Sequence, residues 1–197
     1  MAELIRWAER LFLIPLSIMV IWRIAPKIED HPQLAIFLIS EVVSVVLLLT
    51  QRRGTWSVKM YPLVIALMGT ACGLLVLPTG PQIAPDWLSQ LLIFQGALIA
   101  LAAKLFLGRS FGVVPANRGV KSQGVYRIVR HPMYAGYILN QLGFLLVFFS
   151  AWNIAIYALA WLLLYLRARE EERFLEADEA YREYCAKVRY RLIPGIA

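Results

Sequence analysis

The sequence has few cysteines and no stretch rich in serine or glycine that would divide it into parts. Its 197 residues contain two cysteines. Cys72 lies in an apolar run and Cys185 in a charged C-terminal region, so we expect no disulfide between them. Neither has the Cys or His neighbours of a metal site, so we expect no bound metal. Without a linker, residues 1–197 are predicted to form a single domain.

Acidic residues are also scarce relative to basic ones. The chain has 13 Asp and Glu against 20 Lys and Arg, which gives a formal net charge of +7. The basic residues lie in short segments between apolar runs, which is the pattern of a membrane protein with cationic cytoplasmic loops. We therefore expect no nucleic-acid partner.

Apolar residues are abundant: 60% of the chain is hydrophobic and the mean hydropathy is +0.63. Soluble domains are about 45–50% apolar, so the excess is best explained by lipid contact. Helices are expected, because an unpaired backbone group in lipid costs several kcal/mol. The apolar runs that are long enough, or nearly so, to cross a bilayer are 9–25, 33–50, 60–77, 87–107, 132–150 and 153–168.

The basic loops predict the topology. Arg52, Arg53 and Lys59 follow the second run, and a loop with five basic residues and no acid follows the fourth. Six spans with both termini in the cytoplasm satisfy the positive-inside rule. Five spans would leave one basic loop outside, unless the first run lies in the membrane interface. No small-residue cleavage site follows the first run, which favours a first membrane helix over a removed signal peptide. The predicted fold is an all-α polytopic transmembrane bundle with a cytoplasmic C-terminal helical tail.

Residues 124–136 carry the most informative motif, Gly-Val-Tyr-Arg-Ile-Val-Arg-His-Pro-Met-Tyr-Ala-Gly. Pro132 suits the first position of a helix, which makes His131 the N-cap. Such a helix end is positive and attracts anions, and nearby arginines strengthen this. The backbone N–H groups predicted to be free there are those of Met133, Tyr134 and Ala135. Basic residues and Tyr also flank membrane helices for purely structural reasons.

Two further elements follow. Residues 167–175 read Arg-Ala-Arg-Glu-Glu-Glu-Arg-Phe-Leu at the end of the last run. They form either a solvated helix face with an i,i+4 pair between Arg167 and Glu171, or a carboxylate cluster that holds an amine. Residues 181–194 then predict an amphipathic helix that ends in an extended segment before Pro194.

The order Gly-x-Tyr-x-x-x-Arg-His-Pro-x-Tyr-x-Gly, helical hairpin, Glu-Glu-x-x-Leu, Tyr-x-x-Tyr and Ile-Pro resembles the isoprenylcysteine carboxyl methyltransferase and phospholipid N-methyltransferase family, over roughly residues 105–197. Val125 departs from the Pro that relatives often have there. The resemblance implies a membrane methyltransferase that uses S-adenosylmethionine, with residues 1–107 as N-terminal transmembrane helices and 108–197 as the cofactor-binding core. The cofactor-binding residues that it implies are Gly124, Tyr126, Arg130, His131, Pro132, Tyr134, Gly136, Glu171 and Glu172. The catalytic residues expected are Arg130, Arg167, Arg169 and Glu172.

The acceptor stays open between an isoprenylcysteine-type carboxylate, a lipid amine and another amphiphile. Glu41 lies within the second run, where an ionised side chain costs at least about 2.5 kcal/mol. It is either a protonated or hydrogen-bonded structural carboxyl that meets Asn140 or Gln141, or part of a substrate pocket together with these two residues. The expected location is a prokaryotic plasma membrane, with membrane lipids as partners and an active site on the cytoplasmic side.

Two other classes of function remain open from the sequence. Sterol-reductase-like enzymes, which use NADPH, share an Arg-His-x-x-Tyr-x-Gly run, but typically have Asn and Asp where this chain has Met133 and Tyr137. A transporter or a non-catalytic membrane partner would need polar residues throughout the bundle midplane, where only a few occur.

Overall fold

The chain folds into a helical bundle in a computed structural model that describes residues 2–29, 35–56 and 60–195. The main helices are α1 (Ala2–Ile24), α2 (Ala35–Leu49), α3 (Met60–Ala71), α4 (Asp86–Leu107), α5 (Pro132–Val147), α6 (Ala151–Leu175) and α7 (Glu179–Lys187). The short 3-10 helices are η1 (Ala25–Lys27), η3 (Cys72–Leu75), η4 (Gly108–Ser110) and η5 (Gly124–Arg127). β1 (Thr55–Trp56) and β2 (Ala116–Asn117) form one antiparallel pair, with Thr55 opposite Asn117.

Each of the six apolar runs overlaps one main helix, which confirms the all-helical prediction. Two described helices are long and apolar enough to cross a membrane, Asp86–Ser110 and Ala151–Leu175. Leu38–Leu49 and Met60–Ala71 are apolar but shorter. α1 has 23 residues, but its first half carries four charged side chains. The number of spans therefore stays a prediction.

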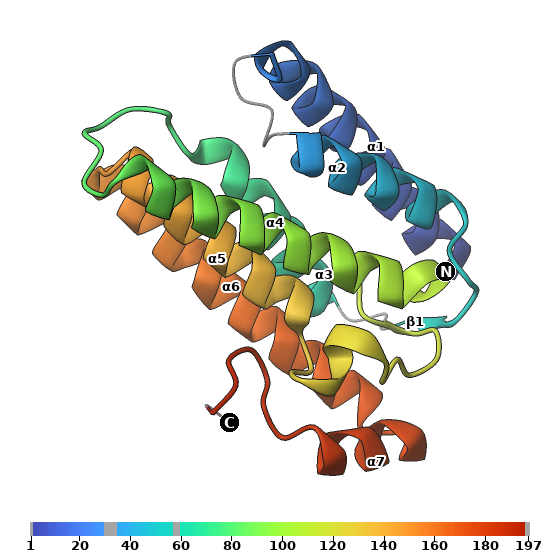
Figure 1. Cartoon of the computed structure of the whole chain (residues 1–197). Coiled ribbons are helices and arrows are strands. Elements are labelled where there is room, and N and C mark those ends of the chain that lie inside the picture. Colours follow the sequence, from blue (N-terminus) through green and yellow to red (C-terminus); the bar gives the residue numbers. More distant parts are fainter. Residues whose placement is uncertain (1, 30–34, 57–59, 196–197) are drawn as a thin grey trace.

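Four pairs of helices make the main contacts of the bundle, and only two of them are neighbours in the chain. α1 packs against α2, α2 against α4, α4 against α5, and α3 against α6. Figure 1 shows the α1–α2 pair on one side of α4 and the α5–α6 hairpin on the other, with α7 beyond the end of the bundle. α4 and α5 approach most closely because glycines face each other. A Cβ at Gly96 would lie 2.4 Å from the Asn140 nitrogen, and one at Gly136 would lie 2.7 Å from the Ala100 nitrogen.

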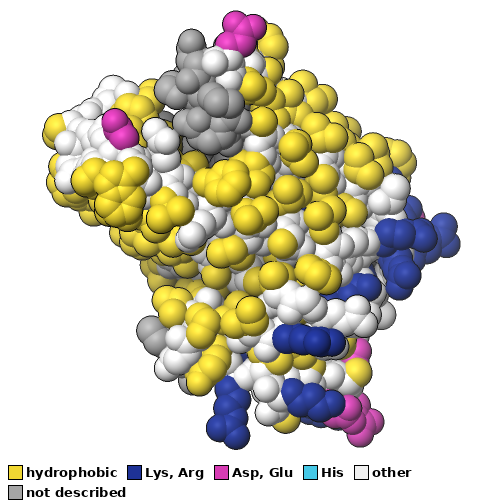
Figure 2. All heavy atoms as spheres, in the orientation of Figure 1, with side chains coloured by type: hydrophobic (Ala, Val, Ile, Leu, Met, Phe, Trp, Pro, Cys, Tyr) yellow, Lys and Arg dark blue, Asp and Glu magenta, His cyan; other side chains and the backbone are white. Residues whose placement is uncertain are grey.

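The loops after the second and fourth runs meet at one end of the bundle. Arg109 Nε donates to the Thr50 carbonyl at 2.8 Å, and the Arg52 N–H donates to the Arg109 carbonyl at 2.8 Å. Lys59, the other basic residue expected in this loop, lies outside the described residues. Figure 2 shows Lys and Arg side chains at this end and beside α7, with hydrophobic side chains over much of the rest of the face. Both basic loops thus lie on the same side, as the predicted topology requires.

Candidate functional site

Glu172 joins three segments at the end of α6. Its Oε1 lies 3.0 Å from His131 Nε2 and 3.2 Å from Arg130 Nε. Its Oε2 accepts hydrogen bonds from Arg191 Nε at 2.9 Å and Nη2 at 2.8 Å. The side chain is 6% exposed. Both carboxylate oxygens are therefore already engaged by groups of the protein.

The C-terminal segment lies along the residues that precede α5. The Arg130 N–H donates to the Tyr190 carbonyl and the His131 N–H to the Arg191 carbonyl, both at 2.9 Å. The bond to Glu172 raises the pKa of Arg191 above its ordinary value, because a charged partner favours the charged guanidinium. Tyr184 Oη of α7 donates to the Tyr126 carbonyl at 2.8 Å. The tail is thus fastened to the Arg-His-Pro segment through backbone and side chain.

Glu171 faces a different direction from Glu172, since successive residues on a helix differ by about 100° in direction. Its Oε2 accepts a hydrogen bond from Tyr134 Oη at 3.0 Å. The Tyr134 ring stacks on His131 with centroids 5.3 Å apart, and the Arg167 guanidinium carbon lies 5.2 Å from the Tyr134 centroid. Tyr134 thus connects the start of α5 with the carboxylates of α6.

These segments enclose a cavity, called here the loop cavity, with about 800 Å³ of open space that includes its solvent mouth. Its walls come from the end of α4, the loop 110–121, η5, the start of α5, the end of α6 and α7. The polar and aromatic residues that line it are Ser110, Arg118, Lys121, Tyr126, Arg130, His131, Tyr134, Glu171, Tyr181 and Tyr184. Burial raises the pKa of Tyr126 and Tyr184, so these phenols are neutral at physiological pH.

The start of α5 is partly as predicted. Pro132 is the first residue of the helix and His131 is the N-cap. The expectation of three free N–H groups is wrong: those of Tyr134 and Ala135 donate to the His131 carbonyl at 3.1 and 3.2 Å. The helix turns tightly enough here to satisfy both donors itself. An anion in the loop cavity would therefore depend on side-chain cations.

Other predicted site residues have structural places. Gly124 has φ +58°, and a Cβ there would lie 2.2 Å from the Phe106 ring. Gly136 contacts the backbone of α4, and neither Gly136 nor Pro132 lines the loop cavity. Arg169 is exposed beside the Tyr165 ring, 5.9 Å from its centroid, away from this cavity.

Glu41, Asn140 and Gln141, the three expected substrate-binding residues, line one cavity. This interhelix cavity lies between α2, α4 and α5, with about 400 Å³ of open space. Glu41 Oε2 accepts a hydrogen bond from Ser17 Oγ at 2.9 Å. Asn140 Nδ2 donates instead to the Ile93 carbonyl, and Gln141 Oε1 accepts from Trp161 Nε1, so the expected contact with Glu41 is not found among the described residues. The sequence analysis missed Lys104, which also lines this cavity. The available signal was a single cation near the end of an apolar run.

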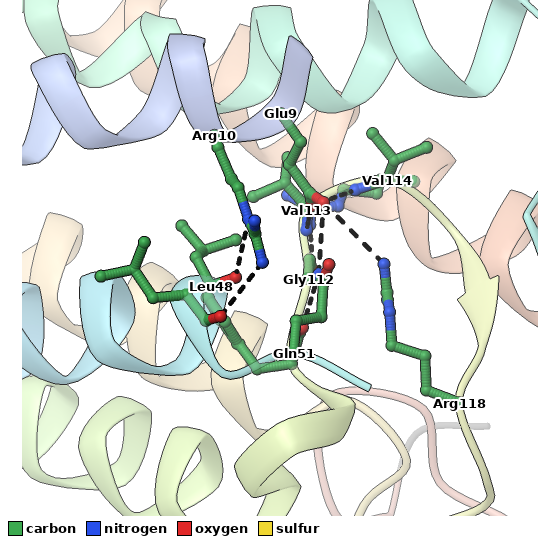
Figure 3. A network of polar contacts seen from close by, with 11 residues as sticks. Glu9, Arg10, Leu48, Gln51, Gly112, Val113, Val114 and Arg118 are labelled. Atoms are coloured by element: carbon green, nitrogen blue, oxygen red, sulfur yellow. Dashed lines mark hydrogen bonds and ion pairs between the residues drawn. The ribbon is translucent and has the colours of Figure 1, made fainter. Parts of the chain in front are cut away.

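A second network was not expected from the sequence. Figure 3 shows Glu9 of α1 pointing at the backbone of the loop that follows α4. Its Oε1 accepts from the N–H groups of Val113 and Val114, the latter at 3.1 Å. Its Oε2 accepts from Gln51 Nε2 at 3.2 Å and lies 3.9 Å from Arg118 Nη2. Val113, Val114 and Arg118 line the loop cavity, so α1 supports one wall of it.

The loop cavity lies largely within a segment that is recognisable by comparison with known families. Residues 88–177 match the sequence model of the Isoprenylcysteine carboxyl methyltransferase (ICMT) family. The expected resemblance is thereby confirmed over this segment, which runs from α4 to just beyond α6. The match supports a membrane methyltransferase in general. The matched residues end before α7 and the C-terminal tail, although the motifs that carry the resemblance continue into both. No curated protein matches the chain.

Proposed function

We propose that this chain is an integral membrane methyltransferase that uses S-adenosylmethionine and methylates a lipidic or amphiphilic acceptor. The observation that carries the proposal is that the Arg-His-Pro and Glu-Glu stretches of the ICMT segment meet around the loop cavity. This cavity presents cations, a carboxylate and aromatic rings together. It also lies at the end of the bundle that carries the basic loops, which favours a multi-pass topology with the site and both termini in the cytoplasm.

The side chains of the loop cavity fit the chemical groups of S-adenosylmethionine. Arg118, Lys121 and Arg130 are cations suited to its carboxylate. Glu171 is suited to its amine, and the tyrosine rings to its adenine and its sulfonium. We assign the amine to Glu171 because Glu172 is already held by His131, Arg130 and Arg191. Glu172 then holds the tail against the cavity.

Bound S-adenosylmethionine would supply an electrophilic methyl group on sulfur for an in-line displacement. The protein then needs mainly to position the reactants and exclude water. The tail is placed for both tasks, because its backbone pairs with Arg130 and His131 and Tyr184 closes on Tyr126. A carboxylate acceptor needs no base, whereas an ammonium group must first lose a proton.

Ligand stabilisation of the purified full chain in detergent tests the cofactor. S-adenosylhomocysteine should raise the melting temperature and NADPH should not; the reverse result would contradict the proposal in favour of a reductase. Glu171→Gln should weaken S-adenosylhomocysteine binding about tenfold or more, as expected for loss of a charge-assisted contact. Glu170→Gln is the matched control, because Glu170 pairs with Arg173 and does not line the cavity. Equal affinities in the two variants would remove the role of Glu171.

Methyl transfer from labelled S-adenosylmethionine to a panel of amphiphiles tests the acceptor. The panel pairs a prenylated thiol carboxylic acid with its amide, and a lipid amine with its quaternary analogue. We expect label in either the acid or the lipid amine, and none in the corresponding amide or quaternary analogue. Label in none of the amphiphiles, with S-adenosylhomocysteine bound, would exclude these acceptor classes.

A further inference from the structure

The interhelix cavity contains a buried cation that no carboxylate of the described residues neutralises. Lys104 is 2% exposed. Its Nζ donates to Ser40 Oγ at 2.8 Å and to the Ser40 carbonyl at 3.3 Å, and it lies 5.7 Å from the centroid of the Tyr137 ring. All of these partners are uncharged. A buried ion without a counter-charge is costly, so the site favours an anionic group beside Lys104.

Glu41 presents the opposite charge to the same cavity. Its Oε2 accepts a hydrogen bond from the neutral hydroxyl of Ser17, at 2.9 Å. Although both side chains line one cavity, no ion pair joins Glu41 to Lys104 within the described structure, where each side chain contacts a serine instead. The cavity therefore holds a cation and a carboxylate apart, and a ligand that carries both charges would satisfy each of them.

The position of the cavity indicates where such a ligand comes from. Lys104 lies three residues before the end of α4 and Glu41 eight before the end of α2, which is roughly 4.5 and 12 Å at the α-helical rise. Tyr137, Asn140 and Gln141 of α5 are partly exposed, so the cavity reaches the side of the bundle. In the multi-pass topology proposed above, the side of the bundle at this depth faces lipid.

From these contacts we propose that the interhelix cavity binds the zwitterionic head group of a membrane lipid. The phosphate lies towards Lys104 and the ammonium group towards Glu41. A zwitterion has no net charge, so it enters a low-dielectric site at less cost than either ion alone. No residue that lines the interhelix cavity also lines the loop cavity. The lipid site therefore does not depend on the proposed methyl transfer.

Lipid binding to the delipidated full chain in a non-ionic detergent tests the proposal. Three lipids with the same acyl chains separate the two charges: phosphatidylethanolamine, phosphatidylglycerol, which lacks the amine, and diacylglycerol, which lacks both charges. By native mass spectrometry, the wild type should bind phosphatidylethanolamine about tenfold or more tightly than diacylglycerol. Phosphatidylglycerol should fall between them.

Single substitutions assign each charge. Lys104→Met should remove the preference for phosphatidylglycerol over diacylglycerol and reduce the preference for phosphatidylethanolamine, which keeps its contact with Glu41. Glu41→Gln should remove the preference for phosphatidylethanolamine over phosphatidylglycerol. Lys104→Arg, which keeps the charge, should retain the wild-type order and guards against loss of folding in the Met variant. Lys187→Met is the matched control, because Lys187 is exposed at the end of α7, and it should behave as wild type.

Three results would overturn the proposal: wild-type selectivity retained in both Lys104→Met and Glu41→Gln, equal binding of the three lipids by the wild type, or displacement of the lipid by soluble phosphoethanolamine at a similar concentration. The last would mean that the site takes a free zwitterion. S-adenosylhomocysteine stabilisation is measured in the same samples. Its absence would contradict the methyltransferase while leaving the lipid result intact.

Discussion

Glu9 offers the sharpest test of whether the N-terminal helices help to build the loop cavity. Its side chain is 0% exposed and accepts hydrogen bonds from two backbone N–H groups and from Gln51. Arg118, its ion-pair partner, is 3% exposed, and burial lowers its pKa while Glu9 opposes that shift. Glu9→Gln keeps the size of the side chain but removes the charge. The remaining amide oxygen cannot serve all of these donors.

The size of the effect follows from these contacts. A hydrogen bond to a charged group contributes about 1.5–3 kcal/mol, and removing one partner of a buried ion pair costs about 3–5 kcal/mol. Because Gln still accepts one or two of the bonds, we expect the free energy of unfolding to fall by about 3 kcal/mol. For a chain of this length, 1 kcal/mol shifts the melting temperature by roughly 2–4 °C, so the expected decrease is roughly 6–12 °C.

The substitution should also weaken the binding of S-adenosylhomocysteine, because Val113, Val114 and Arg118 line the loop cavity. Both quantities are measured by thermal melting in detergent, with and without the ligand. Glu3→Gln is the control, since Glu3 is on the same helix but exposed, in an i,i+3 pair with Arg6. If Glu9→Gln matched Glu3→Gln in melting temperature and in ligand affinity, the reasoning about this network would be wrong.

Two more outcomes are expected. Gly136→Ala should lower the free energy of unfolding by about 1–3 kcal/mol in detergent, since the new Cβ would lie 2.7 Å from backbone atoms of α4. Gly73→Ala is the control and should not lower it, because nothing lies within 4 Å of its new Cβ. Asp178, which caps α7, has its pKa lowered from 3.8, mainly by the hydrogen bond from Asn117. Because its folded-state pKa is depressed, its stabilising effect is present above pH 3.8 and is lost as the pH falls through the lower folded value. The difference in melting temperature between wild type and Asp178→Asn should therefore shrink as the pH falls from 7 towards 2, and a constant difference would contradict this.

The helices could be predicted from the sequence because apolar runs of this length fold as helices in lipid wherever they pack. Their ends were harder to place. The third run, 60–77, changes to a 3-10 turn at Cys72, so α3 is much shorter than the run. Hydropathy does not detect this change, because Gly73 and the leucines beside it are as apolar as the residues of α3.

The carboxylates of α6 show a second limit of the sequence. Glu171 and Glu172 are adjacent, and the motif assigned both to the cofactor. Their roles separate because α6 is rotated so that one faces the loop cavity and the other faces Arg191 of the tail. The packing of α6 against α3 and α5 sets that rotation, so it cannot be predicted from the local sequence of α6 alone.

The interactions that the sequence analysis missed all join residues that are distant along the chain. Glu9 meets Val113 across 104 residues, and Lys104 meets Ser40 across 64. Neither pair follows a helical or strand period, so no pattern search connects them. The ionisable member of each pair lies where a charge is costly, and this cost can be used in sequence analysis. An ionisable residue in an apolar run needs a partner elsewhere in the chain or in a ligand. For Glu9 the partner is the backbone that forms one wall of the loop cavity. For Glu41 and Lys104 the proposed partner is the lipid head group. The N-terminal helices, which fall outside the ICMT match, are therefore expected to shape both cavities.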